Sequence, residues 1–283
     1  MRWSGRRESE NIDDRRQLGG SGKIALGGGL SGIIVLLLVW LMGGNPLELM
    51  NMMQEDQSGQ TGVYESSAEE DSLKHFSAFV LASTEDVWTA IFKQMGKTYR
   101  KPTLVFFSGY VNSACGSASS STGPFYCPGD EKLYVDLSFY DEMKRSLGGG
   151  GDFAFAYVIA HEVGHHVQKL LGTNEQYEKL RQKASEKEAN ALTVKLELQA
   201  DFYAGVWAYH EKKLFDSLDD TDLYEAINTA SAIGDDRLQK QAQGYVVPDS
   251  FTHGTSAQRQ RWFKKGFDTG DIRQGDTFSM KNL

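Results

Sequence analysis

The chain has 283 residues with 30 Lys and Arg against 38 Asp and Glu, a net charge of −8, and 40% of its residues are hydrophobic. This composition excludes a disordered protein and a multi-span membrane protein. The negative charge, without a long Lys/Arg run, argues against a nucleic-acid surface. The two cysteines are too few for a disulfide scaffold or a cysteine-based zinc finger.

An uncharged apolar segment follows a basic arm near the start of the chain. The arm, residues 1–23, carries six Lys or Arg and four carboxylates, and residues 24–42 carry no charge. As a helix these nineteen residues span roughly 28 Å, the thickness of a hydrocarbon core. A buried core helix would show a polar stripe, and a cleaved signal peptide would be shorter and end in Ala-x-Ala. We therefore expect an uncleaved single transmembrane helix that anchors the chain in the lipid bilayer.

The distribution of charge also predicts the orientation of the chain. The Lys/Arg bias places the arm in the cytoplasm and everything after residue 42 outside the bacterial inner membrane. Gly28 and Gly32 form a Gly-x-x-x-Gly spacing, which favours a homodimer through the membrane span. Residues 43–71, with seven carboxylates and no Lys or Arg, read as a flexible acidic linker. The domain predicted at 72–283 is long enough to bury a core.

Within this domain, helices outnumber strands. The predicted elements are, in chain order, a helix at 80–95, a strand at 103–107, a Ser/Gly-rich loop at 109–128, a strand at 131–139, a helix at 153–171 with Asp152 as its N-cap, a helical stretch from 175 to about 214 with one interruption, and helices at 222–233, 235–242 and 256–266. The pattern predicts a helix-dominated α+β fold with a small sheet near its start.

Cys115 and Cys127 lie twelve residues apart in the Ser/Gly-rich loop. Two unpaired thiols are the alternative, and the sequence of the loop alone does not decide between them. Outside the cytoplasm the conditions are oxidising, so the predicted topology favours a disulfide. Metal binding by these cysteines is disfavoured because no second pair or nearby histidine completes a site.

The helix at 153–171 contains His161-Glu162-x-x-His165. Two histidines four residues apart project from one helical face and can bind one metal ion. Glu162 lies about 100° around the helix, where it can take a proton from a metal-activated water. A pair of hydrogen-bonded core histidines is the alternative. However, two imidazoles and a carboxylate in so apolar a helix need a compensating partner, which a divalent metal supplies.

A third ligand is expected from a downstream helix, because catalytic zinc usually has three protein ligands. Glu197 and Asp201 are one turn apart and share a helical face. We expect Glu197 to bind the metal and Asp201 to accept a hydrogen bond from a ligand histidine. An ordinary solvated acidic face is the alternative, but the apolar neighbours of these acids predict burial. His166 is interpreted as structural or as support for the site.

Four segments carry a resemblance to a known family: 156–168, Glu197-x-x-Ala-Asp201, Gly123-Pro-Phe-Tyr-Cys-Pro128, and 251–259. They resemble the putative neutral zinc metallopeptidase family of bacteria, single-span envelope proteins, across nearly the whole chain. More distantly, Glu-x-x-Ala-Asp and the His253 to Arg259 spacing are similar to membrane-associated peptidases with the gluzincin arrangement. The resemblance implies a zincin-like domain that binds one Zn²⁺, and a downstream histidine or arginine that helps at the active site.

These parts predict a membrane-anchored zinc metalloendopeptidase that acts on envelope proteins or peptides. Glu162 is the predicted general base, which then delivers the proton to the leaving amine. His253 is the candidate oxyanion donor, with Arg259 and Tyr203 as the other candidates, and a helix-capping role is its alternative. We expect the strand around 134–138 to pair with an extended substrate.

A catalytically silent or latent zinc-stabilised scaffold of the envelope is the rival function. Retention of Glu162 favours the enzyme, since a structural zinc site has no use for a base beside it.

Overall fold

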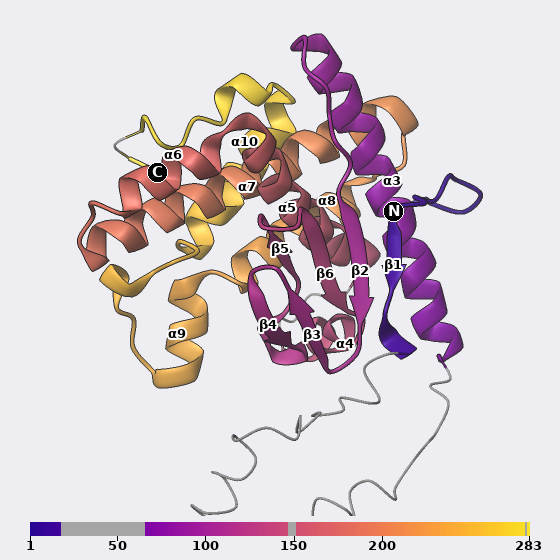
Figure 1. The fold of residues 1–283 in the computed structure, drawn as a ribbon, viewed down its shortest axis with the longest axis horizontal. Helices are drawn as coiled ribbons and strands as arrows, with labels where there is room; N and C mark the ends of the chain where they lie inside the picture. Colours follow the sequence, from indigo (N-terminus) through magenta and orange to yellow (C-terminus); the bar gives the residue numbers. More distant parts are fainter. Residues whose placement is uncertain (18–65, 147–150, 281) are drawn as a thin grey trace, which may run out of the picture.

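A four-stranded mixed sheet packs against a helical layer in the computed structural model, which describes residues 1–17, 66–146, 151–280 and 282–283 (Figure 1). The sheet has the order β1-β2-β6-β5. β1 pairs in parallel with β2 and β2 with β6, whereas β5 is antiparallel to β6. A separate antiparallel ribbon joins β3 to β4. The strands are β1 Ile12–Asp14, β2 Thr103–Phe107, β3 Tyr110–Ser113, β4 Gly116–Ser119, β5 Phe125–Cys127 and β6 Lys132–Asp136.

The central strand β2 is apolar on both faces. Leu104 and Phe106 belong to the main helical core, whereas Val105 and Phe107 pack in a smaller cluster with Val111 of β3. Such a continuous apolar run is typical of a strand covered on both faces.

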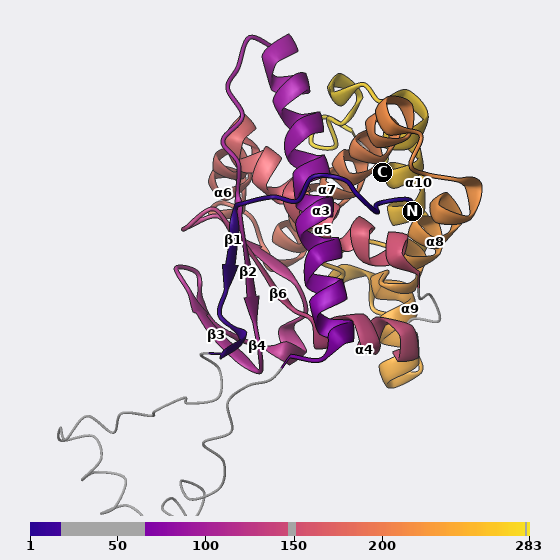
Figure 2. The same cartoon turned by 90° about the vertical axis from the view of Figure 1, so that its right-hand side faces the viewer.

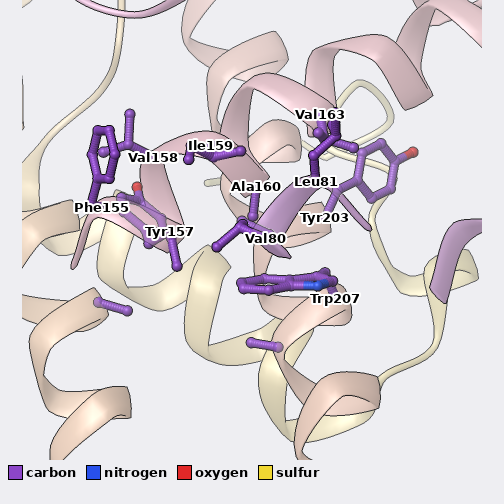
Figure 3. Packing of buried hydrophobic residues seen from close by; sticks show 14 of the residues in the cluster. Val80, Leu81, Phe155, Tyr157, Val158, Ile159, Ala160, Val163, Tyr203 and Trp207 are labelled. Carbon is purple, nitrogen blue, oxygen red and sulfur yellow. The ribbon is translucent and has the colours of Figure 1, made fainter. Parts of the chain in front are cut away.

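The helices pack chiefly around α5 and α7, both of which are largely buried. Figure 3 shows side chains of α3, α5 and α7, among them Val80, Ala160 and Trp207, meeting in one cluster. α7 also packs along α10. The helices are α3 Ala68–Gln94, α4 Ser138–Ser146, α5 Asp152–Leu171, α6 Thr173–Arg181, α7 Glu186–Phe215, α8 Asp220–Ala232, α9 Asp235–Gln243 and α10 Ser256–Thr269.

The predicted helix-dominated α+β class is confirmed, including the interruption that separates α6 from α7. Three local predictions were wrong. The loop predicted at 109–128 contains β3, β4 and β5, and the first helix of the domain begins at Ala68 rather than at residue 80. Gly151, not Asp152, is the N-cap of α5. Strands such as β4, with the sequence Gly-Ser-Ala-Ser, have no apolar alternation, so the sequence pattern does not reveal them.

The N-terminal residues are part of this fold. Residues 1–23 are predicted to be separate from a domain at 72–283, and in the structure β1 forms the outer strand next to β2. The expected span at 24–42, with Gly28 and Gly32, lies outside the described residues. In the parts of the chain that the structure describes, no helix is both long and apolar enough to cross a bilayer.

Candidate metal centre and active site

The two histidines of the motif lie on α5, and Glu197 reaches them from α7. Glu197 Oε2 is 3.2 Å from His161 Nε2, and its Oε1 is 3.5 Å from His165 Nε2. One ligand atom from each of the three residues lies within 4.8 Å of the others. Tetrahedral zinc with bonds of about 2.1 Å separates its ligand atoms by about 3.4 Å. The three predicted ligands are therefore brought together, and the two separations to Glu197 are close to this value.

The hydrogen bonds of the two Nδ1 atoms turn both Nε2 atoms towards Glu197, where a metal ion could replace the direct contacts. His161 Nδ1 lies 2.8 Å from Asp201 Oδ1, and His165 Nδ1 lies 2.9 Å from Gln168 Oε1. Because both partners are oxygen acceptors, each neutral ring carries its proton on Nδ1. Two imidazole nitrogens and one carboxylate form a donor set that suits zinc well.

Asp201 is the centre of a buried hydrogen-bond network. Besides His161, it accepts a hydrogen bond from the hydroxyl of Tyr157 at 2.5 Å. It also accepts two from Arg259, from Nε and Nη2, each at 2.8 Å. Asp201 and Arg259 are both buried. Arg259, one of the candidate oxyanion donors, thus holds the carboxylate that orients the candidate ligand His161.

The charges around the site shift the pKa of each group. Burial alone would lower the pKa of His161, but the carboxylates of Asp201 and Glu197 raise it to about 10. Burial acts to raise the pKa of Asp201, yet Arg259 and His161 lower it to about 2. The two motif histidines likewise outweigh burial and hold the pKa of Glu197 well below its usual range. Without metal, His161 is therefore protonated on both ring nitrogens at neutral pH, between Asp201 and Glu197. A divalent cation would replace the proton on Nε2.

Glu162 is buried beside the candidate ligands, and its pKa is shifted in the opposite direction to that of Glu197. Burial raises its pKa, while the charges of His165 and His161 and the backbone N–H of Tyr126 act to lower it. A carboxylate with a raised pKa is a stronger base and is better matched to proton transfer near neutral pH.

A cleft of about 500 Å³ opens over these groups. Residues 122–126 line it, including Phe125 and Tyr126 of β5. The expected substrate strand at 134–138 is not at this edge, since β6 pairs with both β2 and β5. β5 is the outer strand of the sheet beside the cleft. The expected substrate strand is thus the neighbour of the true outer strand. β5 was not available as a candidate, because it lies inside the segment that was predicted to be a loop.

The sequence profile of the putative neutral zinc metallopeptidase family matches residues 1–278. The chain belongs to this family. It is 51% identical over 285 residues to the uncharacterized protein YpfJ of Escherichia coli K12, an alignment that covers 98% of this chain and 99% of that protein. It is 43% identical over 204 residues to the uncharacterized protein Rv2575 of Mycobacterium tuberculosis H37Rv, covering 69% of this chain and 68% of that one. No solved structure matches it significantly.

The structure of this family member gives the three candidate oxyanion donors different surroundings. His253 lines the cleft with about half of its side chain exposed, and its Nδ1 lies 3.3 Å from Asp235 Oδ1. The same carboxylate of Asp235 accepts the backbone N–H groups of residues 252–254 and so fixes the loop that carries His253. Tyr203 does not line this cleft and packs edge-on against Trp88.

Two residues that shape the site were missed by the sequence analysis. A Cβ at Gly164 would lie 2.9 Å from the carbonyl oxygen of Ala200, so this glycine allows α5 and α7 to approach closely. Gln168, which binds His165, also donates a hydrogen bond to the carbonyl oxygen of Leu196 at 2.7 Å. The spacing of Gln168, three residues after His165, is the signal that could have found it.

His166 supports the strand beside the cleft. Its Nδ1 lies 3.0 Å from the hydroxyl of Tyr126, and its Nε2 lies 2.6 Å from the carbonyl oxygen of Arg100. The ring is completely buried, and burial lowers its pKa. A neutral ring can accept a hydrogen bond from the hydroxyl of Tyr126 and donate one to the carbonyl oxygen of Arg100. His166 therefore joins β5 to α5, which agrees with the predicted structural role.

Cys115 and Cys127 form a disulfide that joins β5 to the turn between β3 and β4. The bond joins one end of the cleft-lining strand to the neighbouring ribbon.

Proposed function

We propose that this protein is a zinc-dependent metalloendopeptidase with a zincin-like catalytic domain. The observation that carries the proposal is the convergence of two imidazole nitrogens and the Glu197 carboxylate, with the buried carboxylate of Glu162 beside them in a cleft. A purely structural zinc site needs no additional carboxylate of this kind.

His161, His165 and Glu197 would hold one Zn²⁺. Bound zinc would supply Lewis-acid chemistry, that is, activation of a water and polarisation of a peptide carbonyl. Asp201 keeps the proton of His161 on Nδ1, and Arg259 keeps Asp201 ionised and in place.

Glu162 would act as the general base. Its carboxylate takes the proton from the attacking water and passes it to the leaving amine nitrogen, so that the two proton transfers use one group. The shift of its pKa towards neutrality supports this role.

His253 would donate a hydrogen bond to the developing oxyanion. With its Nδ1 next to Asp235, its Nε2 is the donor that can serve this purpose. Asp235 would hold the ring in this orientation, as carboxylates commonly do for functional histidines.

The substrate would bind as an extended peptide along β5. An outer strand offers unpaired backbone groups, and a peptide that adds to it gains main-chain hydrogen bonds whatever its side chains are. The position of Phe125 and Tyr126 in the cleft lining would place such a peptide across the proposed zinc ligands. Envelope proteins are the proposed substrates, with the domain outside the cytoplasm, because a disulfide is maintained in oxidising compartments.

Cleavage of an unbiased peptide mixture by the full chain tests the proposal. We expect Glu162→Gln to abolish cleavage while the variant still binds zinc, and Glu142→Gln, which changes an exposed carboxylate on α4, to cleave like the parent. Sequencing of the products would give the residue preference on each side of the cut bond. Full zinc occupancy without cleavage by the parent would favour a latent enzyme or a scaffold.

A further inference from the structure

Residues 1–17 dock on the surface of the domain formed by the later part of the chain. β1 pairs with β2 in a register that joins Ile12 to Leu104 and Asp14 to Phe106. Figure 2 shows this segment, in indigo, crossing over α3 before it enters the sheet as β1. Trp3 packs edge-on against Phe76 of α3, with 5.5 Å between the ring centroids.

The docked segment supplies partners for a carboxylate buried in α3. The side chain of Glu85 has no solvent exposure. It accepts hydrogen bonds from Ser9 Oγ at 2.6 Å, from Asn11 Nδ2 at 2.7 Å and from Arg7 at 3.2 Å. Lys101 is the ion-pair partner from outside the segment, at 3.2 Å. Three of these four partners therefore come from residues 1–17.

A second buried carboxylate depends on the same segment. Glu211 of α7 is completely buried and accepts hydrogen bonds from the hydroxyls of Ser83 and Ser217. Within the described residues, Arg6 is the cation that pairs with it. Removing one partner of a buried ion pair is strongly destabilising, because it leaves an uncompensated charge. The stability of the domain therefore depends on the ion pair between Arg6 and Glu211.

The arginines of the segment are used by the fold. Arg2 pairs with Asp216, Arg6 with Glu211 and Arg7 with Glu85, so three cations bind acids more than seventy residues away. Arg15 and Arg16 pair with Asp13 and Asp14 inside the segment. These are the same positive charges from which a cytoplasmic location of the arm was expected.

We propose that residues 1–17 and the catalytic domain lie on the same side of the membrane, with the arm serving as the outer strand of the sheet. A strand cannot pair with β2 through a hydrocarbon core of about 30 Å. The proposal revises both the cytoplasmic side assigned to the arm and the single crossing expected between the arm and the domain; the catalytic chemistry is not involved.

Single-cysteine labelling of the full chain tests this topology directly. The two native cysteines are paired, so each variant has one free thiol. Ser4→Cys places it at an exposed position of the arm, and Thr98→Cys places it at an exposed position between α3 and β2. A membrane-impermeant maleimide is added to spheroplasts before and after lysis. We expect the two variants to label in the same step, from whichever side they face. Labelling of one before lysis and of the other only after lysis would overturn the proposal.

Paired arginine variants test the docking independently of topology. Arg6→Met removes the cation next to buried Glu211, whereas Arg2→Met removes an ion pair whose side chains are 72% and 90% exposed. We expect Arg6→Met to lower the melting temperature of the purified full chain by roughly 10 °C, and Arg2→Met to leave it unchanged. Equal melting temperatures for Arg6→Met and the parent would show that the arm is not docked and would remove the basis of the proposal. Neither readout requires peptidase activity, so failure of the proposed function would not affect them.

Discussion

Replacing Gly164 by alanine tests how closely α5 and α7 must approach for the three ligands to meet. The added Cβ would lie 2.9 Å from the carbonyl oxygen and 3.1 Å from the Cα of Ala200. Since ordinary contacts begin at 3.4 Å, the two helices must separate by about 0.5 Å. Glu197 precedes Ala200 by three residues on the same helix and moves with it. A metal site tolerates deviations of about 0.2 Å in its ligand distances, so the shift would disturb coordination.

We expect Gly164→Ala to weaken zinc binding by about tenfold or more, as for other losses of support around metal ligands. The effect on folding should be smaller. Overpacking costs about 1–3 kcal/mol, and the higher helix propensity of alanine offsets roughly 1 kcal/mol of this. The free energy of unfolding of the metal-free chain should therefore fall by only about 0–2 kcal/mol.

Competition with a chelating indicator measures the zinc affinity, and urea unfolding measures stability. Gly129→Ala is the matched control, because the same methyl group meets Ala114 Cβ at 3.2 Å in an exposed loop. It should bind zinc like the parent. Unchanged zinc affinity in Gly164→Ala would refute the argument that helix separation limits the geometry of the site.

Three further predictions follow from the network and the disulfide. Asp201→Asn leaves Arg259 buried without its charge partner, so the free energy of unfolding measured in urea should fall by about 3–5 kcal/mol. The zinc affinity should fall 10- to 100-fold, because His161 loses the carboxylate that orients it. A variant as stable as the parent would contradict this prediction. Zinc binding should release at least one proton near pH 7, because the pKa of His161 is about 10 without metal, and the zinc affinity should therefore rise with pH. Calorimetry in buffers of different ionisation enthalpy would detect the released proton. A zinc affinity that does not depend on pH would contradict this prediction. Replacing both Cys115 and Cys127 by serine removes a bond between residues twelve apart and should cost roughly 3 kcal/mol of stability. Thermal melting of the variant and of the parent, each with and without reductant, measures this loss. If the reduced parent melts at the same temperature as the untreated variant, the loss comes from the bond itself.

The sequence predicted which side chains meet at the candidate metal site because their spacing along each helix is fixed. His161 and His165 are four residues apart on one helix, and Glu197 and Asp201 are four apart on another, so each pair shares a face before any tertiary structure is known. What the spacing does not give is the distance between the two helices. That distance depends on Gly164, whose role is visible only when Ala200 lies opposite it.

The parts of the fold that the sequence did not predict owe their structure to distant residues. β1 is three residues long and contains two aspartates, so it has no strand pattern of its own and is a strand only because it pairs with β2. β5 has three residues between a Ser/Gly-rich segment and a proline. The ion pairs of Arg6 with Glu211 and of Arg7 with Glu85 could not be predicted either, because the partners are far apart in sequence.

The central claim is that His161, His165 and Glu197 hold one zinc ion, with Glu162 beside it but not among its ligands. The most direct measurement is the zinc content per chain of the purified full-length protein, compared with Glu162→Gln and Glu197→Gln. We expect one zinc per chain in the parent and in Glu162→Gln, and a large loss in Glu197→Gln, which keeps the size of the side chain but removes the anionic ligand. A folded parent without zinc, or a Glu197→Gln variant that retains it fully, would contradict the assignment.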